Sequence, residues 1–215
     1  MLRYIYGGAL HQFPKLRHTM FADRSSQFRQ RLGWNVDVDD QGHERDAYDG
    51  KNPLYVIWQR ADGSHGGSLR FLPTTGETMV NDHFTHLTDG VSIRHPLIWE
   101  CTRFCLAAGA DPRVSAALML GGMEIGLGFG LTDAVGVFDD RMVRVYRRLG
   151  WTPTILGTAG RGRGAVSVGL WAFDRTLRAG LLRKAGVSSA LSRLWFDRAF
   201  GPIAAPVVGP VAMVG

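Results

Sequence analysis

Short blocks of apolar and β-branched residues recur along the chain, each bounded by glycine, proline or polar residues, and this pattern predicts strands. We expect the strands at residues 2–6, 54–59, 67–72, 98–106, 132–138, 151–156 and 165–173. Helical periodicity predicts helices at residues 11–31, 113–127 and 141–149, a short irregular helix near 81–84, and basic helical sequence after residue 174. This order predicts an α/β fold with a mixed sheet flanked by helices, neither purely parallel nor doubly wound.

The two longest predicted helices differ in their patterns. In the first, Arg17, Arg24 and Arg31 recur at seven-residue spacing and share a face with Phe21 and Phe28. The second is almost entirely apolar, which predicts a buried helix. The first helix therefore presents charge and aromatic rings to a neighbour, while the second belongs to the core.

Composition places the chain among soluble globular proteins. Its 215 residues are 45% hydrophobic and 20% charged, which suits one domain with a sizeable core. We expect residues 1–175 to form that domain and residues 176–215 to form a basic helical extension with an Ala, Pro and Val tail. No apolar run is long enough to span a membrane. The first residues are too polar for a secretory signal, so we expect a cytoplasmic protein.

The net charge of +6 is distributed unevenly. Residues 1–140 contain 13 Lys and Arg against 17 Asp and Glu, whereas residues 141–200 contain 12 against 2. This asymmetry predicts an acidic partner for the later segment: a nucleic acid, an anionic membrane or an acidic protein.

Several familiar cofactor motifs are incomplete in this sequence. The Gly126–Gly130 stretch follows a predicted helix and precedes a strand, the reverse of a dinucleotide-binding loop. Cys101 and Cys105 lie four apart in one predicted strand, too far for a disulfide, and no further ligands complete a zinc site. We therefore expect neither a metal nor a cofactor.

Two charged residues interrupt the apolar strand 98–106. Burying an unpaired charge is costly, so Glu100 and Arg103 must be paired or functional. Residues three apart on a regular strand point to opposite faces. If both side chains line one pocket, we expect a β-bulge between them.

Other charged and aromatic residues also occur in structured segments or the acidic loop at residues 37–49. The combined set is Arg24, Phe28, Trp34, Asp46, Asp49, Arg70, Glu100 and Arg103. Arginine binds a carboxylate through two hydrogen bonds, carboxylates bind an ammonium group, and an aromatic face attracts a sulfonium cation. S-adenosylmethionine carries all three groups.

The spacing of these residues resembles that of a known family. The matching motifs are Arg24-x3-Phe28-x2-Arg31-Leu32-Gly33-Trp34, Glu44-x-Asp46-x2-Asp49, Arg70-Phe71-Leu72-Pro73-Thr74-Thr75-Gly76 and Trp99-Glu100-x2-Arg103-Phe104. Together they resemble the LuxI-type acyl-homoserine lactone synthases over residues 16–106, with weaker similarity to residue 173. The resemblance implies a GNAT-like fold with a splayed mixed sheet. It also implies that the amine of S-adenosylmethionine attacks an acyl-carrier-protein thioester, after which a lactone closes with release of methylthioadenosine.

The resemblance also implies residue roles. Glu100 would serve as the catalytic base, directly or through water, and Arg103 would steady Glu100 or the substrate. The S-adenosylmethionine site would comprise Arg24, Phe28, Trp34, Asp46, Asp49, Arg70 and Phe104. Asp49 and Arg70 have an alternative role as a structural clamp on the N-terminal region.

The acyl chain and its carrier are expected in the later half of the chain. An apolar wall would include Leu118, Met123 and Gly136, and the acidic carrier protein would dock on Arg144, Arg147 and Arg148. In the family, a threonine near the position of Gly136 accompanies 3-oxo chains, so its absence favours an unsubstituted or 3-hydroxy chain.

Three alternatives stay open at this level. Arg17 and Phe21 repeat the Arg-x3-Phe spacing and offer a second register for the pocket. The chain also suits another GNAT-like N-acyltransferase using acyl-coenzyme A, although it lacks the expected pyrophosphate loop. A nucleic-acid-binding module would explain the basic later segment but leaves Glu100, Asp46 and Asp49 without a purpose.

Overall fold

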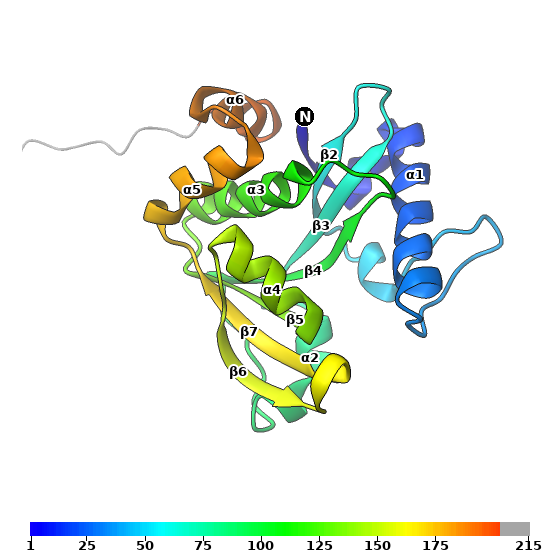
Figure 1. The fold of residues 1–215 in the computed structure, drawn as a ribbon, viewed down its shortest axis with the longest axis vertical. Helices are drawn as coiled ribbons and strands as arrows, with labels where there is room; N and C mark the ends of the chain where they lie inside the picture. Colours follow the sequence, from blue (N-terminus) through cyan, green and yellow to red (C-terminus); the bar gives the residue numbers. More distant parts are fainter. Residues whose placement is uncertain (203–215) are drawn as a thin grey trace, which may run out of the picture.

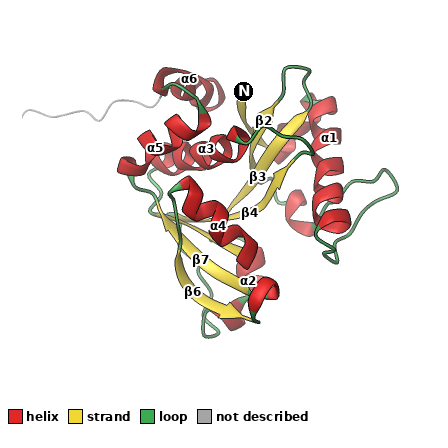
Figure 2. Cartoon of the chain, viewed as in Figure 1, coloured by secondary structure: helices red, strands yellow, loops and turns green. Residues whose placement is uncertain are grey.

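The structure is a computed structural model that describes residues 1–202, so the predicted Ala, Pro and Val tail lies outside the described residues. Seven strands form one sheet in the order β1-β2-β3-β4-β5-β7-β6 (Figures 1 and 2). The strands are β1 (Leu2–Tyr6), β2 (Leu54–Gln59), β3 (His65–Pro73), β4 (Ile98–Leu106), β5 (Asp133–Asp139), β6 (Thr154–Ala159) and β7 (Val166–Ala172). Every predicted strand is present: three have the predicted boundaries, and the other four differ from them by one to three residues.

Six α-helices and several short helical turns complete the described part of the chain. The α-helices are α1 (Pro14–Ser25), α2 (Met79–His83), α3 (Arg113–Phe129), α4 (Asp140–Leu149), α5 (Arg175–Ala185) and α6 (Ser189–Phe200). The turns are η1 (Gly7–Gln12), η2 (Ser26–Arg31), η3 (Ala47–Gly50), η4 (Thr85–Leu87) and η5 (Gly162–Gly164).

The prediction of one continuous helix over residues 11–31 was wrong. A 3-10 turn ends before α1, which begins at Pro14, and the last turn is the π-helical η2. Proline suits the first position of a helix because its missing N–H has no partner there in any case. The π-helical turn shifts the angular positions of the residues that follow it.

The sheet is mixed, as predicted, and it splays in the middle. Strands β1 to β4 are antiparallel neighbours, and β5, β7 and β6 form a second antiparallel group. The groups join through only three parallel pairs between β4 and β5, the last being Glu100 with Val135. Beyond that pair β4 stays with β3 and β5 stays with β7, and Figure 1 shows the two groups diverging.

The two faces of the first strand group are covered differently. Val56 and Phe71 belong to the main core with the nearly all-apolar α3, which is buried as predicted. Tyr55 and Ile57, which alternate with these positions, pack with α1 in a smaller cluster. The charged residues discussed below occupy the α1 face.

The segment after residue 175 packs onto α3. Leu181 of α5 and Trp195 of α6 join the main core. Arg178 donates to both carboxylate oxygens of Glu124 on α3, and the Ser192 hydroxyl donates to the same carboxylate. These buried contacts hold α5 and α6 against the rest of the described chain.

Within residues 1–202, every helix is too short or too polar to cross a lipid bilayer. Both cysteines are free thiols.

Candidate active site

Three arginines from separate elements meet three carboxylates of one loop. Arg24 comes from α1, Arg70 from β3 and Arg103 from β4. Their partners are Glu44, Asp46 and Asp49, which lie just before or within η3. We call these six residues the arginine–carboxylate cluster. Its formal charges cancel, which is what makes the burial of so many ionised groups tolerable.

Arg24 is 1% exposed and pairs with two of the three acids. Its terminal nitrogens donate to the two oxygens of Asp49 at 2.9 and 3.0 Å, and its Nε donates to Glu44. This two-pronged geometry uses the planar fork that lysine lacks. Arg24 therefore ties α1 to the loop that contains both acids.

Arg70 extends the cluster across the sheet. It donates to Asp46 through two nitrogens and to Asp49 Oδ1 at 3.0 Å, while its Nε donates to the Thr102 hydroxyl at 3.1 Å. With no exposed surface, Arg70 has its charge fully compensated inside the protein. The arginine that interrupts a predicted strand is thus paired rather than free.

Asp46 and Asp49 also build the turn that presents them. Asp46 accepts from the N–H groups of Tyr48 and Asp49, and Asp49 accepts in return from the N–H of Asp46. This reciprocal arrangement is a capping box at the start of η3. Backbone N–H groups and guanidinium nitrogens together occupy most of the hydrogen-bond acceptor positions of the two carboxylates.

Asp49 is ionised despite its burial. Burial alone would raise the pKa of its carboxyl, but the charge and hydrogen bonds of Arg24, the charge of Arg70 and a hydrogen bond from the Tyr55 hydroxyl outweigh it. The pKa of Asp49 is therefore held below its ordinary value. Asp49 is an anchor for arginines and not a proton acceptor at neutral pH.

Glu100 differs from these acids because no arginine pairs with it directly among the described residues. It is 1% exposed, and its oxygens accept from the backbone N–H groups of Met79 at 3.1 Å and Val80 at 2.6 Å. Burial raises the pKa of Glu100 to about 7, while the two backbone donors and the charge of Arg70 oppose the rise. A carboxyl with a pKa near neutrality is suited to proton transfer.

A β-bulge is present in β4, as expected if Glu100 and Arg103 line one pocket, and it lies at Arg103 and Phe104. Thr102 pairs with Arg70 and Cys105 with Ser68, so Arg103 and Phe104 together face one residue, Leu69. Arg103 takes a left-handed backbone conformation, φ +54°, which is uncommon for a residue other than glycine.

The bulge brings Arg103 onto the face that carries Thr102. From there it donates to Glu44 at 3.1 Å and lies 2.7 Å from Asp46 Oδ2, and its guanidinium approaches Met79, whose N–H binds Glu100. Both charged residues of the strand therefore reach one site. Phe104, the other residue of the bulge, packs instead against the main core with α3. Its predicted role in binding S-adenosylmethionine stays a prediction.

An aromatic wall adjoins Arg103. Phe28 and Trp34 stack with 5.1 Å between ring centroids and 7° between planes, and the Arg103 guanidinium lies 5.6 Å from the Phe28 ring. Phe28 is buried, whereas Trp34 is 38% exposed. Solvent-accessible aromatic surface next to a guanidinium and a buried carboxyl is typical of a ligand site.

Of the two Arg-x3-Phe registers, the later one enters the cluster. Arg24 and Phe28 contact it directly, while Arg17 is exposed and Phe21 lies in the smaller core cluster. Phe21 does contact the Arg24 guanidinium, at 5.1 Å. The first register therefore lies beside the site and not in it.

The residues predicted for the acyl chain and the carrier protein lie elsewhere. Leu118 and Met123 are fully buried in the main core. At Gly136 an added Cβ would lie 2.8 Å from the Cys101 carbonyl oxygen, so a side chain there requires a shift of β4. Arg144, Arg147 and Arg148 are exposed on α4. Their roles stay predictions.

Two further residues contribute without having been assigned a role from sequence. Glu44 accepts from both Arg24 and Arg103, and the Tyr55 hydroxyl donates to Asp49 at 2.6 Å. The spacing Glu44-x-Asp46 was a signal for the first, because alternate residues of an extended segment share a side. Tyr55 carried no such signal, since an aromatic in a strand is ordinarily a core residue. The described residues contain no group of three or more His, Cys, Asp or Glu side chains arranged so that it could hold a metal ion.

Comparison with known proteins decides the family. The autoinducer synthase profile matches residues 10–175. The chain belongs to the autoinducer synthase family. An acyl-homoserine-lactone synthase of Rhizobium etli is 43% identical over 194 residues, covering 85% of this chain and 91% of the relative. The chain is accordingly an acyltransferase of the acyl-homoserine-lactone synthase type, which confirms the LuxI-type resemblance.

Solved structures of autoinducer synthases share the fold. The CoA-dependent acyl-homoserine lactone synthase BjaI, determined with S-adenosylmethionine and isopentyl-CoA, aligns with a TM-score of 0.78 at 22% identity, covering 88% of this chain and 90% of that one. The CoA-dependent synthase MesI aligns with a TM-score of 0.77 at 23% identity, covering 89% and 98%. The GNAT-like fold expected for this family is confirmed.

Proposed function

We propose that this synthase acylates the amine of S-adenosylmethionine from an acyl thioester and then closes the acylated product to an N-acyl-homoserine lactone. The observation that carries the proposal is Glu100, a buried carboxyl with a pKa of about 7 beside the arginine–carboxylate cluster. Glu100 is also the last β4 residue paired with β5, so it stands where the sheet splays. A donor entering between the diverging strands would meet this carboxyl.

The first step transfers the acyl group. Glu100, directly or through a water, accepts a proton from the substrate ammonium, and the resulting amine attacks the thioester carbonyl. The carbon–nitrogen bond forms as the carbon–sulfur bond breaks, and the departing thiolate takes up a proton. In the second step a substrate carboxylate oxygen attacks the γ-carbon of the methionine chain, and the bond from that carbon to the sulfonium sulfur breaks. Lactone closure releases methylthioadenosine, so no oxidant, reductant or resident cofactor is needed.

We assign the residues of the cluster and of the adjoining aromatic wall to two roles. Arg24, Arg70, Asp46 and Asp49 have their charges satisfied by one another, which favours positioning of the N-terminal region over direct ligand contact. Arg103 also pairs with Glu44 and Asp46, but it adjoins the stacked Phe28 and the exposed Trp34, where its guanidinium suits the substrate carboxylate and the rings suit the sulfonium. This division adopts the structural-clamp alternative for Asp49 and Arg70.

Two observations bear on the acyl donor. The exposed arginines of α4 suit an acidic acyl carrier protein. MesI and BjaI, in contrast, are CoA-dependent, which supports a coenzyme A thioester. We propose the carrier protein as the donor because the exposed arginines of α4 belong to a segment, residues 141–200, that contains 12 basic and 2 acidic residues, and we place the reaction in the cytoplasm. Family membership favours the enzyme over a nucleic-acid-binding module.

The direct test is expression in a bacterium that makes no acyl-homoserine lactones, followed by mass spectrometry of the medium. We expect a lactone with wild-type protein and none with Glu100→Gln at equal soluble expression. Purified enzyme with S-adenosylmethionine and either acyl carrier protein or coenzyme A carrying the same acyl chain then identifies the donor. Soluble wild-type protein that forms no lactone from either donor, tested with several chain lengths, would overturn the proposal.

A further inference from the structure

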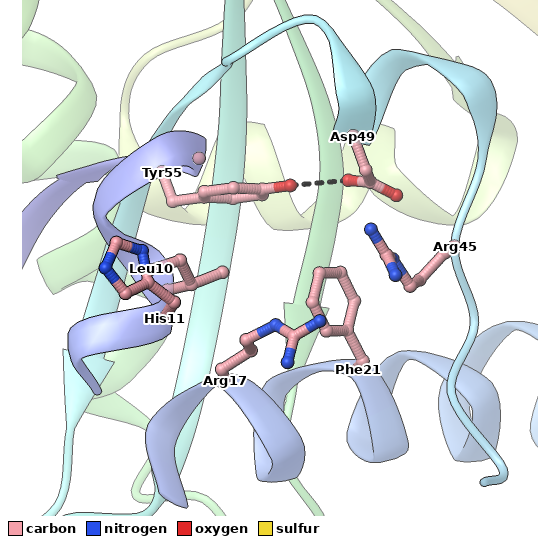
Figure 3. A pocket seen from close by; sticks show the side chains of 8 residues that line it. Leu10, His11, Arg17, Phe21, Arg45, Asp49 and Tyr55 are labelled. Atoms are coloured by element: carbon pink, nitrogen blue, oxygen red, sulfur yellow. Dashed lines mark hydrogen bonds between the residues drawn. The ribbon is translucent and has the colours of Figure 1, made fainter. Parts of the chain in front are cut away.

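A hollow opens beside the arginine–carboxylate cluster. It has a volume of about 240 Å³ and lies between η1, α1 and the loop before η3 (Figure 3). The side chains that matter for its chemistry are His11, Arg17, Phe21, Arg45, Asp49 and Tyr55. Phe28, Trp34, Glu100 and Arg103 are not among its lining residues, so the hollow is separate from the proposed substrate site.

Two uncompensated cations face this hollow. Within residues 1–202, neither Arg17 nor Arg45 lies within 4 Å of a carboxylate oxygen, although every arginine of the cluster does. Arg45 instead rests 5.3 Å from the centroid of the Phe21 ring. Figure 3 shows the two guanidiniums reaching the hollow from opposite sides, Arg17 from α1 and Arg45 from the loop. Like charges held near one another favour an anion between them.

The acid at the inner wall does not cancel this preference. Asp49 already pairs with Arg24 and Arg70 and accepts a hydrogen bond from Tyr55. Its charge is therefore balanced before the charges of Arg17 and Arg45 are considered. The hollow is walled by neutralised groups on its inner side and by two guanidiniums at its opening.

The backbone explains why Arg45 faces this way. It stands between Glu44 and Asp46, whose side chains both enter the cluster. In an extended segment the intervening side chain points to the other side. One stretch of loop therefore supplies the cluster with two acids and the hollow with a base.

We propose that the hollow binds a small oxyanion, a phosphate or carboxylate group, held by Arg17 and Arg45. Guanidinium forks bind both kinds of oxyanion through paired hydrogen bonds. The bound group would bridge α1 to the loop that carries Glu44 and Asp46, and so stabilise the element that supplies the cluster's carboxylates. Arg17 and Phe21 repeat the Arg-x3-Phe spacing but do not belong to the proposed substrate site, and the hollow gives them a role.

The test is calorimetric titration of the full chain with inorganic phosphate or with acetate, at an ionic strength held constant with sodium chloride and with neither enzyme substrate present. We expect saturable binding of at least one anion, weakened at least about tenfold in Arg17→Gln and in Arg45→Gln. Arg29→Gln is the matched control, because Arg29 is an exposed arginine of the adjoining η2 outside the hollow, and it should bind as wild type does.

The outcomes separate the possibilities. Saturation by phosphate or by acetate alone identifies which oxyanion the site prefers, provided that the arginine dependence holds. Heats indistinguishable from dilution for both anions, or equal weakening in Arg29→Gln, would overturn the proposal. Because no substrate is present, failure here leaves the proposed lactone synthesis untouched. Both substituted arginines are exposed, and an unchanged melting temperature in anion-free buffer verifies that each variant folds.

Discussion

The arginines of the cluster and those of α4 show one residue type in two physical situations. Arg24 and Arg70 are 1% and 0% exposed and paired with carboxylates, whereas Arg144, Arg147 and Arg148 are exposed on a helix surface. A buried guanidinium has lost its hydration and depends on its partners, while an exposed one keeps its hydration and acts through a screened field. The buried arginines should therefore determine the stability of the fold. The exposed arginines should instead determine how readily the protein meets a charged partner.

The largest effect is expected from removing a buried arginine. Arg24→Met leaves Asp49 and Glu44 short of a partner, and breaking a buried pair in this way costs about 3–5 kcal/mol in the free energy of unfolding. Arg147→Met is the matched change on α4 and should alter the free energy of unfolding by less than about 0.5 kcal/mol. Urea denaturation of both variants measures the difference. Equal destabilisation would remove the distinction between the two sets.

Glu100→Gln tests the carboxyl that has no arginine partner. Loss of a positioned general base lowers rates by about 100-fold or more, so release of methylthioadenosine should fall by at least that factor. The variant should stay folded, because the glutamine amide oxygen still accepts from the Val80 N–H. Chromatographic assay under saturating S-adenosylmethionine checks this. A folded variant with wild-type turnover would exclude Glu100 as the base.

The pH dependence of the wild type should show two opposite trends from Glu100. Its pKa is raised from 4.5 to about 7, so the ionised base accumulates as pH rises and the rate at pH 6 should be about tenfold below the plateau. Between pH 4.5 and 7 the unfolded chain has released this proton while the folded chain retains it. This group therefore makes the free energy of unfolding decrease as pH rises across that window.

Glu100→Gln should abolish the contribution of this group to the pH dependence of the free energy of unfolding. Asp49 acts in the opposite sense, because its lowered pKa stabilises the fold at neutral pH and this stabilisation is lost on acidification below its ordinary value of 3.8. Rate profiles together with urea titrations at each pH separate the two groups. Identical stability slopes in the wild type and Glu100→Gln would contradict the assignment.

The smallest effect is expected on α4. Replacing Arg144, Arg147 and Arg148 together by glutamine should lower kcat/KM with an acyl carrier protein by about tenfold at low salt, because long-range attraction speeds association. The same change should leave the rate with acyl-coenzyme A and the melting temperature nearly unaltered. Wild-type activity with the carrier protein should itself fall as sodium chloride is raised. A salt-independent reaction would remove α4 as the docking surface.

Local patterns were enough to predict the strands, the buried α3 and the mixed sheet. Apolar alternation and turn residues act over a few positions, so no distant contact is needed to interpret them. The spacing of the motifs also selected eight of the ten residues now placed at the proposed site. Glu44 was visible only as part of a motif, and Tyr55 was not distinguishable from a core aromatic.

The tertiary structure decided what those residues do. Sequence could not show that Arg24, Arg70 and Asp49 satisfy one another, because their partners come from α1, β3 and a separate loop. Nor could it show that burial raises the pKa of Glu100 to about 7, since desolvation depends on everything packed around the group.

Phe104 gives the clearest case of this limit. A bulge at Arg103 turns that arginine toward the cluster and its neighbour toward the core. Motif spacing alone could not show that these two side chains point in different directions. The chain thus specifies by itself which residue types are available and at what intervals, because those properties are local. Which side of the sheet each one faces depended on how β4 pairs with β3, which only the folded protein establishes.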